Sequence, residues 1–385
     1  MIFNALKENL NERTILPRRY GILPGRTFLF GAPKSGKTSL ALQFALSYKK
    51  PMYLDLDDVR LDSAQLQTYL LKIFLEKKLD ILVLDNFKPT LTLPNLQNII
   101  LLGARELAPS DFTPKCIMPL CFEEFVSFSA KNFSLKNLFA FFLKDGNMPE
   151  MLETPHYKKE QRRREVLKLY FGADLEIFLF LLHFQAQAVS IHRIYTALKK
   201  QTKISKDRIY TLLKRWEENG VLFFVPHSLE RTNEPMQKLA KKLYFADFSL
   251  SWIVKFENNI LAQFENMLFL ELVKMRELGG GTISYEEGML VYKDCAYLPI
   301  PFATRELCEK RLQKCTQNTA YIITLSFEDS GEFQCNIRGK KERRESAHKD
   351  SHQISKDIQS ARTDSQKIFW RALNFIDFAL GELAF

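Results

Sequence analysis

Short apolar runs alternate with helical patterns along the N-terminal part of the chain. Short apolar runs bounded by polar residues are typical of buried strands, and apolar residues at helical spacing are typical of helices. The alternation predicts an α/β domain built on a parallel sheet. The predicted strands lie at 26–30, 51–58, 80–87 and 98–104, the predicted helices lie at 37–46 and 63–78, and a further strand and helix lie within 116–128.

Three helical patterns of decreasing hydrophobicity follow in the middle of the chain. Ser205 is placed to cap the third helix, and Gly220 is placed to end it in a left-handed conformation. Two apolar segments after the helices predict a β-hairpin, and three helices with such a wing predict a winged helix-turn-helix. The three helices lie at 173–188, 190–201 and 205–220, and the hairpin segments lie at 221–227 and 241–248.

The C-terminal part again mixes helical and strand patterns. A helix at 264–278, several short strands and a second helix at 304–315 suit a small α/β core. Residues 328–366 are polar and of mixed charge, which predicts a linker or a loose solvated helix. Beyond them, 368–385 carries apolar residues at helical spacing, and we expect this helix to dock onto the body or onto a partner.

The segment GAPKSGKT at 31–38 matches the phosphate-binding loop (P-loop) pattern G-x-x-x-x-G-K-[ST] at every fixed position. It lies between a predicted strand and a predicted helix, as the pattern requires. Backbone N–H groups of such a loop face phosphate oxygens, Lys37 reaches the β- and γ-phosphates, and the Thr38 hydroxyl ligates Mg²⁺. We therefore expect ATP and Mg²⁺ as ligands. The predicted nucleotide-binding residues are Gly31, Ala32, Pro33, Lys34, Ser35, Gly36, Lys37, Thr38 and Ser39.

The segment ILVLDNF at 81–87 has the form of a Walker B strand, an apolar run followed by an acid. Asp85 is expected to hold Mg²⁺ opposite Thr38. P-loop ATPases with an inserted central strand usually place a glutamate after this aspartate, whereas this chain has Asn86. An amide holds a water molecule but cannot accept its proton. Asp85 and Asn86, the predicted catalytic residues, should therefore support only slow hydrolysis.

Acidic residues elsewhere can supply the missing carboxylate. Glu76, Glu106 or Asp57 can each approach the site in space. In a separate role, Asp55, Asp57 and Asp58 follow a predicted strand at the sheet edge that binds ligands in α/β proteins, which suits metal or switching chemistry. They also suit a purely structural role as strand-end caps and turn formers. The sequence alone leaves both interpretations open.

Three arginines near these segments have two interpretations each. Arg18 and Arg19 precede the P-loop strand and either approach the nucleotide or form a solvated pair. Arg105 follows the segment 102–104, at a strand end where related ATPases carry a polar residue facing the γ-phosphate. Arg105 is therefore either a phosphate sensor or an ordinary loop charge.

Taken in this order, the motifs resemble the bacterial and archaeal AAA-like ATPase family in which a P-loop domain precedes a winged helix and a C-terminal domain of restriction-endonuclease-like fold. The resemblance covers about residues 10–327. The segments that carry it are GAPKSGKT at 31–38, YLDLDDVRL at 53–61, ILVLDNF at 81–87, IILLGA at 99–104, MPLCFEEF at 118–125, DGNMPEM at 145–151, KKLYFADFSL at 241–250 and FENMLFLELVKM at 264–275.

The resemblance implies ATP binding in the cytoplasm and a division into several modules. The expected modules are a P-loop AAA-like ATP-binding domain at 1–155, a winged-helix domain at 156–255, a degenerate nuclease-like α/β domain at 256–328, a polar linker at 329–366 and a C-terminal amphipathic helix at 367–385.

A nuclease of this fold needs an acid on one strand and an acid-x-lysine on the next, so that two carboxylates hold Mg²⁺ while the lysine steadies the attacking water. The corresponding segment MLVYKDCAYLPIPF at 289–302 contains no acid-x-lysine. Asp294 and Glu265 remain as isolated acids. We therefore interpret this domain as non-catalytic and expect it to serve partner binding or assembly.

The third helix of the predicted winged helix can either read DNA or act as a lid or spacer. In a DNA reader it enters the major groove. Glu217 and Glu218 at its end oppose contact with DNA, whereas the winged helices behind AAA domains often act as lids. The cations that would meet DNA are Lys206, Arg208, Lys214 and Arg215.

The composition limits the partners and the cellular location that we expect for the protein. The net charge of +10 permits binding to nucleic acid without requiring it. The six cysteines include no C-x-x-C pair, so we expect reduced thiols and no zinc site. The longest apolar run, near 177–184, is too short to cross a bilayer, and 1–13 turns polar at once. We expect a cytoplasmic protein without membrane contact.

Two functions follow from these observations. The first is a Mg·ATP-binding protein, a weak ATPase whose nucleotide state controls the winged helix and the C-terminal module. The second is a non-enzymatic DNA-binding regulator that uses its P-loop as a switch. Assembly as a homo-oligomer or with a protein partner is compatible with either function.

Overall fold

The computed structural model divides the chain into two compact units. The first comprises Met1–Gln185, Val189–Phe224 and Leu243–Asn258, and the second comprises Ala186–Ala188, Val225–Lys242 and Asn259–Phe385. Each unit is described by itself. The residues that the structure describes are 17–61, 63–129, 132–231, 239–254, 259–336 and 365–381.

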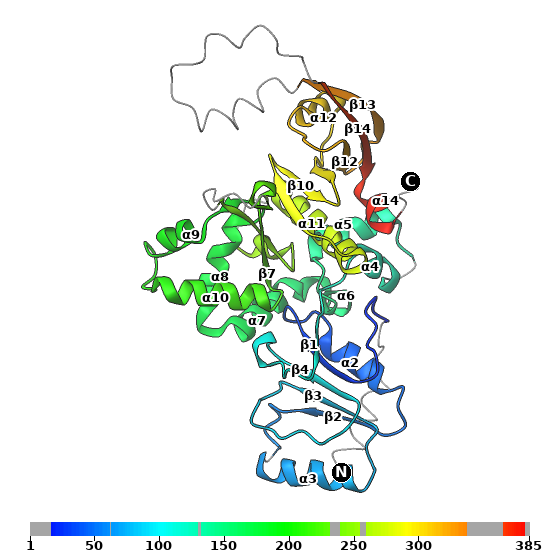
Figure 1. Ribbon diagram of the computed structural model, residues 1–385, viewed down its shortest axis with the longest axis vertical. Coiled ribbons are helices and arrows are strands. Elements are labelled where there is room, and N and C mark those ends of the chain that lie inside the picture. The colour runs from blue at the N-terminus through cyan, green and yellow to red at the C-terminus, as the bar shows by residue number, and fades with distance from the viewer. Residues whose placement is uncertain are drawn as a thin grey trace. The chain divides into compact units, whose positions relative to one another are not determined.

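A five-stranded parallel sheet forms the centre of the N-terminal region, in the order β2-β3-β4-β1-β5 (Figure 1). The predicted α/β fold is confirmed, and β4 lies between the P-loop strand β1 and the Walker B strand β3. The register pairs Asp55 with Asp85, so the ends of β2 and β3 are level. The strands are β1 (Arg26–Phe30), β2 (Pro51–Asp55), β3 (Ile81–Asp85), β4 (Ile99–Leu102) and β5 (Thr113–Cys116).

Helices cover both faces of this sheet. On one face, α2 (Lys37–Ala45) packs Leu40 and Ala41 against the strands. On the other face, α3 (Ser63–Leu75) contributes a second core. Burial on both faces explains why the strands read as continuous apolar runs in the sequence. Ser63 is the first residue of α3, and its side chain lies outside the described residues.

Four helices follow the sheet, and a glycine turn joins them to the rest of the first unit. Leu120 donates its backbone N–H to the carbonyl of Asn147 at 2.9 Å, and the Asn147 side chain donates to the carbonyl of Ala246 at 2.9 Å. The turn thereby joins two segments that are distant in the sequence. The helices are α4 (Phe122–Phe128), α5 (Leu135–Asp145), α6 (Glu150–Glu153) and α7 (Lys159–Phe171).

Three further helices pack around Phe178 and Trp216 and adjoin a three-stranded sheet of order β6-β8-β7. The predicted helix ends are confirmed: the Ser205 side chain accepts a hydrogen bond from the N–H of Arg208, and Gly220 has φ +63°. These elements are α8 (Leu175–Leu181), α9 (Ile191–Leu198), α10 (Lys206–Glu218), β6 (Ala188–Val189), β7 (Leu222–Val225) and β8 (Lys241–Phe245).

The second unit contains a six-stranded mixed sheet in the order β13-β14-β12-β11-β10-β9. One face forms a core with Cys308 and Leu312 of α12, and the long helix α11 contributes Phe264, whose ring contacts Phe375. The elements are α11 (Ile260–Gly279), β9 (Ile283–Glu286), β10 (Met289–Tyr292), β11 (Cys295–Pro299), α12 (Arg305–Leu312), β12 (Thr319–Thr324), β13 (Asp329–Asn336), β14 (Ser365–Asn374) and α14 (Phe375–Leu380).

Two strands of this sheet correct the sequence prediction. Residues 329–336, assigned to a polar linker, form β13, and 367–374, assigned to an amphipathic helix, belong to β14. In β14 the buried residues Ile368, Trp370 and Ala372 alternate with outward-facing ones, which is the period of a strand. Only Phe375–Leu380 of the predicted terminal helix is helical. The rest of the predicted linker, 337–364, and the end 382–385 lie outside the described residues.

No helix in the described ranges combines the length and the apolar character needed to cross a membrane. The cysteines whose side chains are described form no disulfide with one another. In the same part of the chain, no group of three or more His, Cys, Asp or Glu side chains is arranged to hold a metal ion.

Candidate nucleotide site

The P-loop leaves the end of β1 at Gly31 and enters α2 at Lys37. Gly31 has φ +142°, and a Cβ there would lie 2.3 Å from the carbonyl oxygen of Ile117. Glycine is therefore required at this position, because the loop passes directly against the backbone that follows β5. Lys34 is exposed and lies 3.5 Å from Glu150 of α6.

The Lys37 side chain folds back over the P-loop. Its ammonium group donates to the carbonyl oxygens of Gly31 at 3.1 Å and Ala32 at 2.8 Å. Burial lowers the pKa of Lys37 to about 8, and the negative charge of Asp85 offsets only part of that effect. A lysine in this state favours the arrival of a negatively charged ligand, because such a ligand restores the stability of its charged form.

Thr38 and Asp85 face each other across the site, as the sequence predicts. The Thr38 hydroxyl donates to Asp85 Oδ2 at 2.6 Å, and the Tyr53 hydroxyl donates to the same oxygen at 3.2 Å. Hydroxyl and carboxylate oxygens are the ligands that Mg²⁺ prefers, so this pair fits the ion. Sequence reasoning missed Tyr53, although strand alternation places it on the same face of β2 as Asp55.

The Asn86 side chain bonds to the neighbouring strand β2. It adopts φ +54°, and its side-chain amide donates to Asp55 Oδ1 at 2.8 Å. Its backbone N–H donates to Asp85 Oδ1 at 2.9 Å. The bond to Asp55 links the carboxyl ends of β2 and β3 above the sheet.

The acids that the sequence offered as substitutes for a glutamate are engaged elsewhere. Asp57 pairs with Lys88 at 2.7 Å, and Glu76 pairs with Lys78 at 2.8 Å. The third candidate, Glu106, pairs with Arg215 at 2.9 Å.

Asp58 is also engaged in an ion pair. Hydrogen bonds from Arg60 lower its pKa to about 2. Asp58 therefore acts as a turn former, the structural role that the sequence left open.

Arg18 is buried and contacts the P-loop, which corrects the interpretation of Arg18 and Arg19 as a solvated pair. Its guanidinium donates to the carbonyl oxygen of Ser35 at 2.6 Å and to that of Met118 at 2.8 Å. Its Nε atom donates to Glu124 Oε1 at 2.8 Å, and both side chains are almost fully buried. Because it binds the backbone carbonyl of a loop residue, Arg18 positions the loop.

Glu124 holds this arrangement together. It accepts hydrogen bonds from the backbone N–H groups of Arg19 at 2.8 Å and Cys121 at 3.2 Å, in addition to the bond from Arg18. Burial alone would raise the pKa of Glu124, but the bonds and the charge of Arg18 hold it below its usual value. The motif MPLCFEEF contained the signal for this residue, although the sequence did not show its partner.

The turn after β4 joins the sheet to α10. The Arg105 guanidinium lies over the ring of Phe30, 5.3 Å from its centroid, and Phe30 directly precedes the P-loop. The Arg105 backbone N–H donates to Asn219 Oδ1 at 2.8 Å, and the Asn219 amide donates to Glu106 at 2.9 Å. Asn219, which sequence reasoning missed, is buried at the end of α10.

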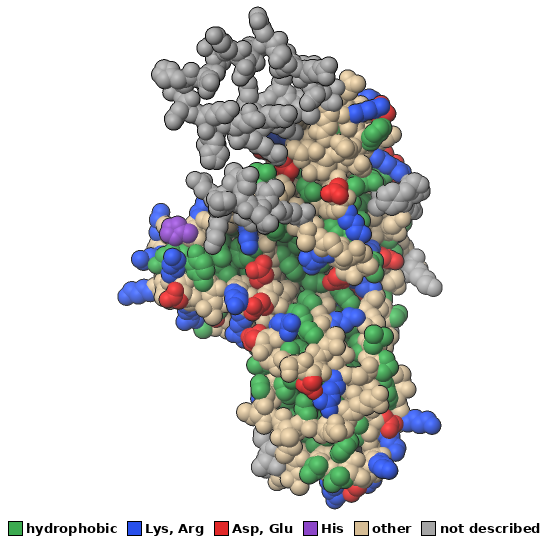
Figure 2. Space-filling view, in the orientation of Figure 1, with side chains coloured by type: hydrophobic (Ala, Val, Ile, Leu, Met, Phe, Trp, Pro, Cys, Tyr) green, Lys and Arg blue, Asp and Glu red, His purple; other side chains and the backbone are tan. Residues whose placement is uncertain are grey.

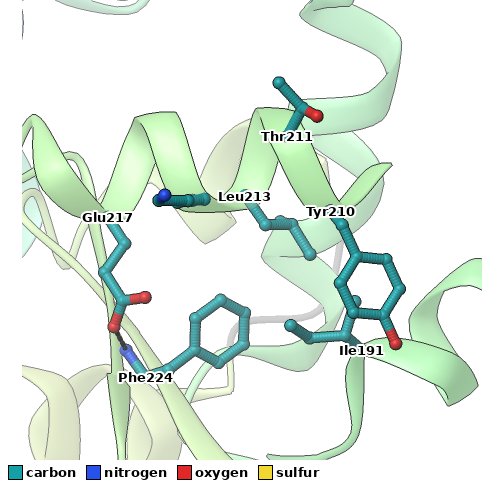
Figure 3. Close-up of a pocket in the computed structure, with 7 residues that line it drawn as sticks. Ile191, Tyr210, Thr211, Leu213, Glu217 and Phe224 are labelled. Carbon is teal, nitrogen blue, oxygen red and sulfur yellow. Dashed lines mark hydrogen bonds between the residues drawn. The ribbon is translucent and has the colours of Figure 1, made fainter. Parts of the chain in front are cut away.

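Three of the cations predicted to meet DNA are held in ion pairs within the first unit, and Lys214 is one of them, 3.8 Å from Glu218. Arg208 pairs with Asp174 at 2.6 Å, and Arg215 pairs with Glu106. A groove of about 260 Å³ lies along α10, where Figure 3 shows the Tyr210 ring opposite Phe224. The Glu217 carboxylate accepts the backbone N–H of Phe224 at 3.2 Å. No P-loop residue lines this groove.

The remaining candidate acids in the second unit do not form a nuclease centre. Glu265 pairs with Lys242 at 2.5 Å, and Asp294 lies in a turn with φ +62°. Neither residue belongs to a metal-binding cluster among the described side chains.

The sheet order and the loop between β1 and α2 define an α/β protein of the P-loop class. No family model matches the chain, and no curated protein matches it.

Several solved structures resemble the chain. A Walker-type ATPase of Pyrococcus abyssi has 15% sequence identity over 65% of this chain and 93% of its own, with a TM-score of 0.37. The ORC1 protein of Aeropyrum pernix in complex with DNA has 14% identity over 71% of this chain and 94% of its own, with a TM-score of 0.27. AMPPCP-bound DnaA from Aquifex aeolicus has 13% identity over 56% of this chain and 87% of its own, with a TM-score of 0.24. TM-scores this low carry no argument about function.

Proposed function

We propose that this protein binds ATP with Mg²⁺ in the P-loop, hydrolyses it slowly and uses nucleotide state to rearrange a winged helix. The observation that carries the proposal is the Thr38–Asp85 contact of 2.6 Å at the mouth of the P-loop. Two hard oxygen ligands at this distance, beside a loop that turns its amides inward, suit a magnesium triphosphate.

Each residue of the site has a defined task in this proposal. The loop amides bind the phosphates, and Lys37 exchanges the carbonyls of Gly31 and Ala32 for phosphate oxygens. Thr38 and Asp85 hold the metal. When bound, Mg²⁺ neutralises phosphate charge and lowers the barrier to attack on the γ-phosphate. Because Asn86 is an amide, it cannot accept a proton, and hydrolysis is correspondingly slow.

Calorimetric titration with Mg·ATP tests nucleotide binding. Wild-type protein should bind, and Lys37→Ala should lose most of the affinity because the β- and γ-phosphates lose their cation. Lys72→Ala, which removes an exposed lysine of α3, is the matched control and should bind like the wild type. Absence of binding heat for a folded wild type with Mg·ATP would disprove the proposal.

The contacts of Asn219 support control of α10 by the nucleotide. A change in the P-loop reaches Phe30, then the Arg105 guanidinium over its ring, and then Asn219 through the Arg105 backbone. Helices α8 to α10 with β7 and β8 form, in this proposal, the winged helix. The second unit is a nuclease-like module without the acid-x-lysine pair, and it serves partner binding or assembly.

Hydrogen exchange tests this coupling. Mg·ATP should change the protection of α10 amides in the wild type, and Asn219→Ala should reduce that change at least about twofold because it removes the bonds to Arg105 and Glu106. Lys214→Ala on the same helix is the control, since the ion pair of Lys214 is with Glu218 of the same helix, at 3.8 Å. An unchanged response in Asn219→Ala would contradict control through this contact.

A second candidate function is a DNA-binding regulator that uses the P-loop as a switch. The observation that favours it is a cluster of exposed cations on α9, α10 and the turn between them. Among the described residues none of them pairs with a carboxylate, and Figure 2 shows Lys and Arg side chains over this region. The residues are Arg193, Lys199, Lys200, Lys203 and Lys206.

Fluorescence anisotropy with a labelled duplex across a salt series tests this candidate. DNA binding through the cluster should weaken as salt rises, and Lys199→Glu with Lys203→Glu should weaken it further and flatten the salt slope. Lys72→Glu on α3 controls for net charge. Equal binding by the double variant and the wild type would rule the cluster out as the DNA site.

A further inference from the structure

Asn86 occupies the position where related ATPases have a glutamate, and the carboxylate of Asp55 lies beside it at the end of β2. In the parallel register of β2 and β3, Asp55 is the partner of Asp85, and both residues end their strands at the edge where the P-loop lies. The Asn86 side chain spans the gap and donates to Asp55 Oδ1 at 2.8 Å. The Asn86 amide therefore holds the carboxylate of Asp55, which belongs to the neighbouring strand β2.

The Asp55 carboxylate is fixed on one side and open on the other. Its Oδ1 atom accepts hydrogen bonds from Asn86 at 2.8 Å and from the backbone N–H of Asp57 at 3.0 Å. Its Oδ2 atom has no hydrogen-bond partner among the described residues, and the residue is half-buried. A carboxylate held by two donors with one open oxygen is suited to orient a water molecule and accept its proton.

The neighbouring acids lack this combination. Asp85 shares its Oδ2 atom with the hydroxyls of Thr38 and Tyr53, and its Oδ1 atom accepts the backbone N–H of Asn86. Asp57, which is exposed, pairs with Lys88. Of these three acids, only Asp55 has one oxygen held by two donors and the other without a hydrogen-bond partner among the described residues.

We propose that Asp55 is the general base of ATP hydrolysis and that Asn86 is its positioning residue. The inference rests on the proposed ATPase function. Asp55 Oδ2 accepts one proton from water, and the water oxygen forms a bond to the γ-phosphorus. The bond from the γ-phosphorus to the β,γ-bridging oxygen breaks, and its electron pair leaves on ADP. The products are ADP, inorganic phosphate and one proton, which Asp55 later returns to solvent.

Single-turnover hydrolysis with enzyme in excess over Mg·ATP measures the chemical step. Asp55→Asn should lower the rate about a hundredfold or more, because the base is lost, while the Kd for Mg·ATP changes less than about threefold. Asp58→Asn, in which the lost acid is paired only with Arg60, is the control and should keep the wild-type rate.

Asn86 variants distinguish positioning from direct chemistry. Asn86→Ala should lower the single-turnover rate less than Asp55→Asn does, because the Asp55 carboxylate remains and loses only one of its two donors. Asn86→Glu combined with Asp55→Asn should recover activity, because a carboxylate returns to the site. The melting temperature of each variant, with and without Mg·ATP, shows whether it is folded and loaded.

The outcomes separate this proposal from the proposed function. Wild-type turnover that persists unchanged in folded Asp55→Asn would overturn the role of Asp55 and leave the ATPase standing. Binding of Mg·ATP by the wild type without any phosphate release would overturn the role of Asp55 and leave nucleotide binding standing. Absence of Mg·ATP binding would overturn both.

Discussion

Nucleotide binding should take up a proton from solution at alkaline pH, because of Lys37. Burial lowers the pKa of Lys37 from 10.5 to about 8 in the nucleotide-free protein, although Asp85 partly opposes this effect. The shift disfavours the charged ammonium by about 3 kcal/mol. A triphosphate beside the ammonium group returns its pKa toward the ordinary value, since the negative charges stabilise the protonated form.

The magnitude follows from the pKa of about 8. Nucleotide-free protein carries a charged Lys37 in about half of the molecules at pH 8 and in about a tenth at pH 9, whereas the bound lysine stays charged at both. Binding therefore takes up about 0.5 proton at pH 8 and about 0.9 at pH 9. The affinity is full below pH 8, and it falls about tenfold per pH unit above that value until the pKa of the bound lysine is reached.

Calorimetric titration in two buffers of different ionisation enthalpy measures this proton uptake. Mg·ATP is fully ionised at these pH values and contributes no proton itself. The charge of Cys116 raises the pKa of Lys37, so a Cys116→Ser variant shows whether the thiol contributes to the uptake. Lys37→Met should bind weakly and take up no proton. Uptake near zero at pH 9 by a wild type that still binds Mg·ATP would refute the reasoning.

Two predictions concern stability, and urea unfolding measures both. The pKa of Glu124 lies below 4.5 because Arg18 outweighs burial, so its contribution is present above pH 4.5 and lost as pH falls through the lowered value. Glu124→Gln should remove this acid-dependent loss and cost about 3–5 kcal/mol at pH 7, because a buried charge loses its partner; an unchanged acid slope would contradict this. Gly146→Ala should cost about 1–3 kcal/mol more than Gly172→Ala. Both glycines have positive φ, but only at Gly146 would a Cβ collide, at 2.2 Å from Ser249 Oγ; equal costs would show that the collision is relieved.

Local patterns were sufficient to predict the first sheet and the P-loop. Each strand is buried on both faces and therefore reads as an unbroken apolar run, and the loop is specified by residues adjacent in the sequence. The end of α10 could be predicted for the same reason, since Ser205 and Gly220 act on the helix they flank. Information within a few residues decides all of these features.

The features that the sequence did not reveal depend on distant partners. In β14, Ile368, Trp370 and Ala372 are buried while Phe369 is 52% exposed. Apolar residues on both faces make a strand pattern resemble a helical one until the pairing with β12 and β13 is known. Asn86 and Asp55 likewise belong to different strands, so their hydrogen bond has no trace in either segment.

The buried pair of Arg18 and Glu124 makes the conformation of the P-loop depend on the helices that follow the sheet. Arg18 holds the carbonyl of Ser35, and Glu124 of α4 fixes Arg18 from a position 106 residues away. A ligand that moves the loop must therefore move this ion pair with it or strain a buried charge, which costs several kcal/mol. The pair therefore holds the loop in place, and we expect a change imposed on the loop to reach α4 through Arg18 and Glu124.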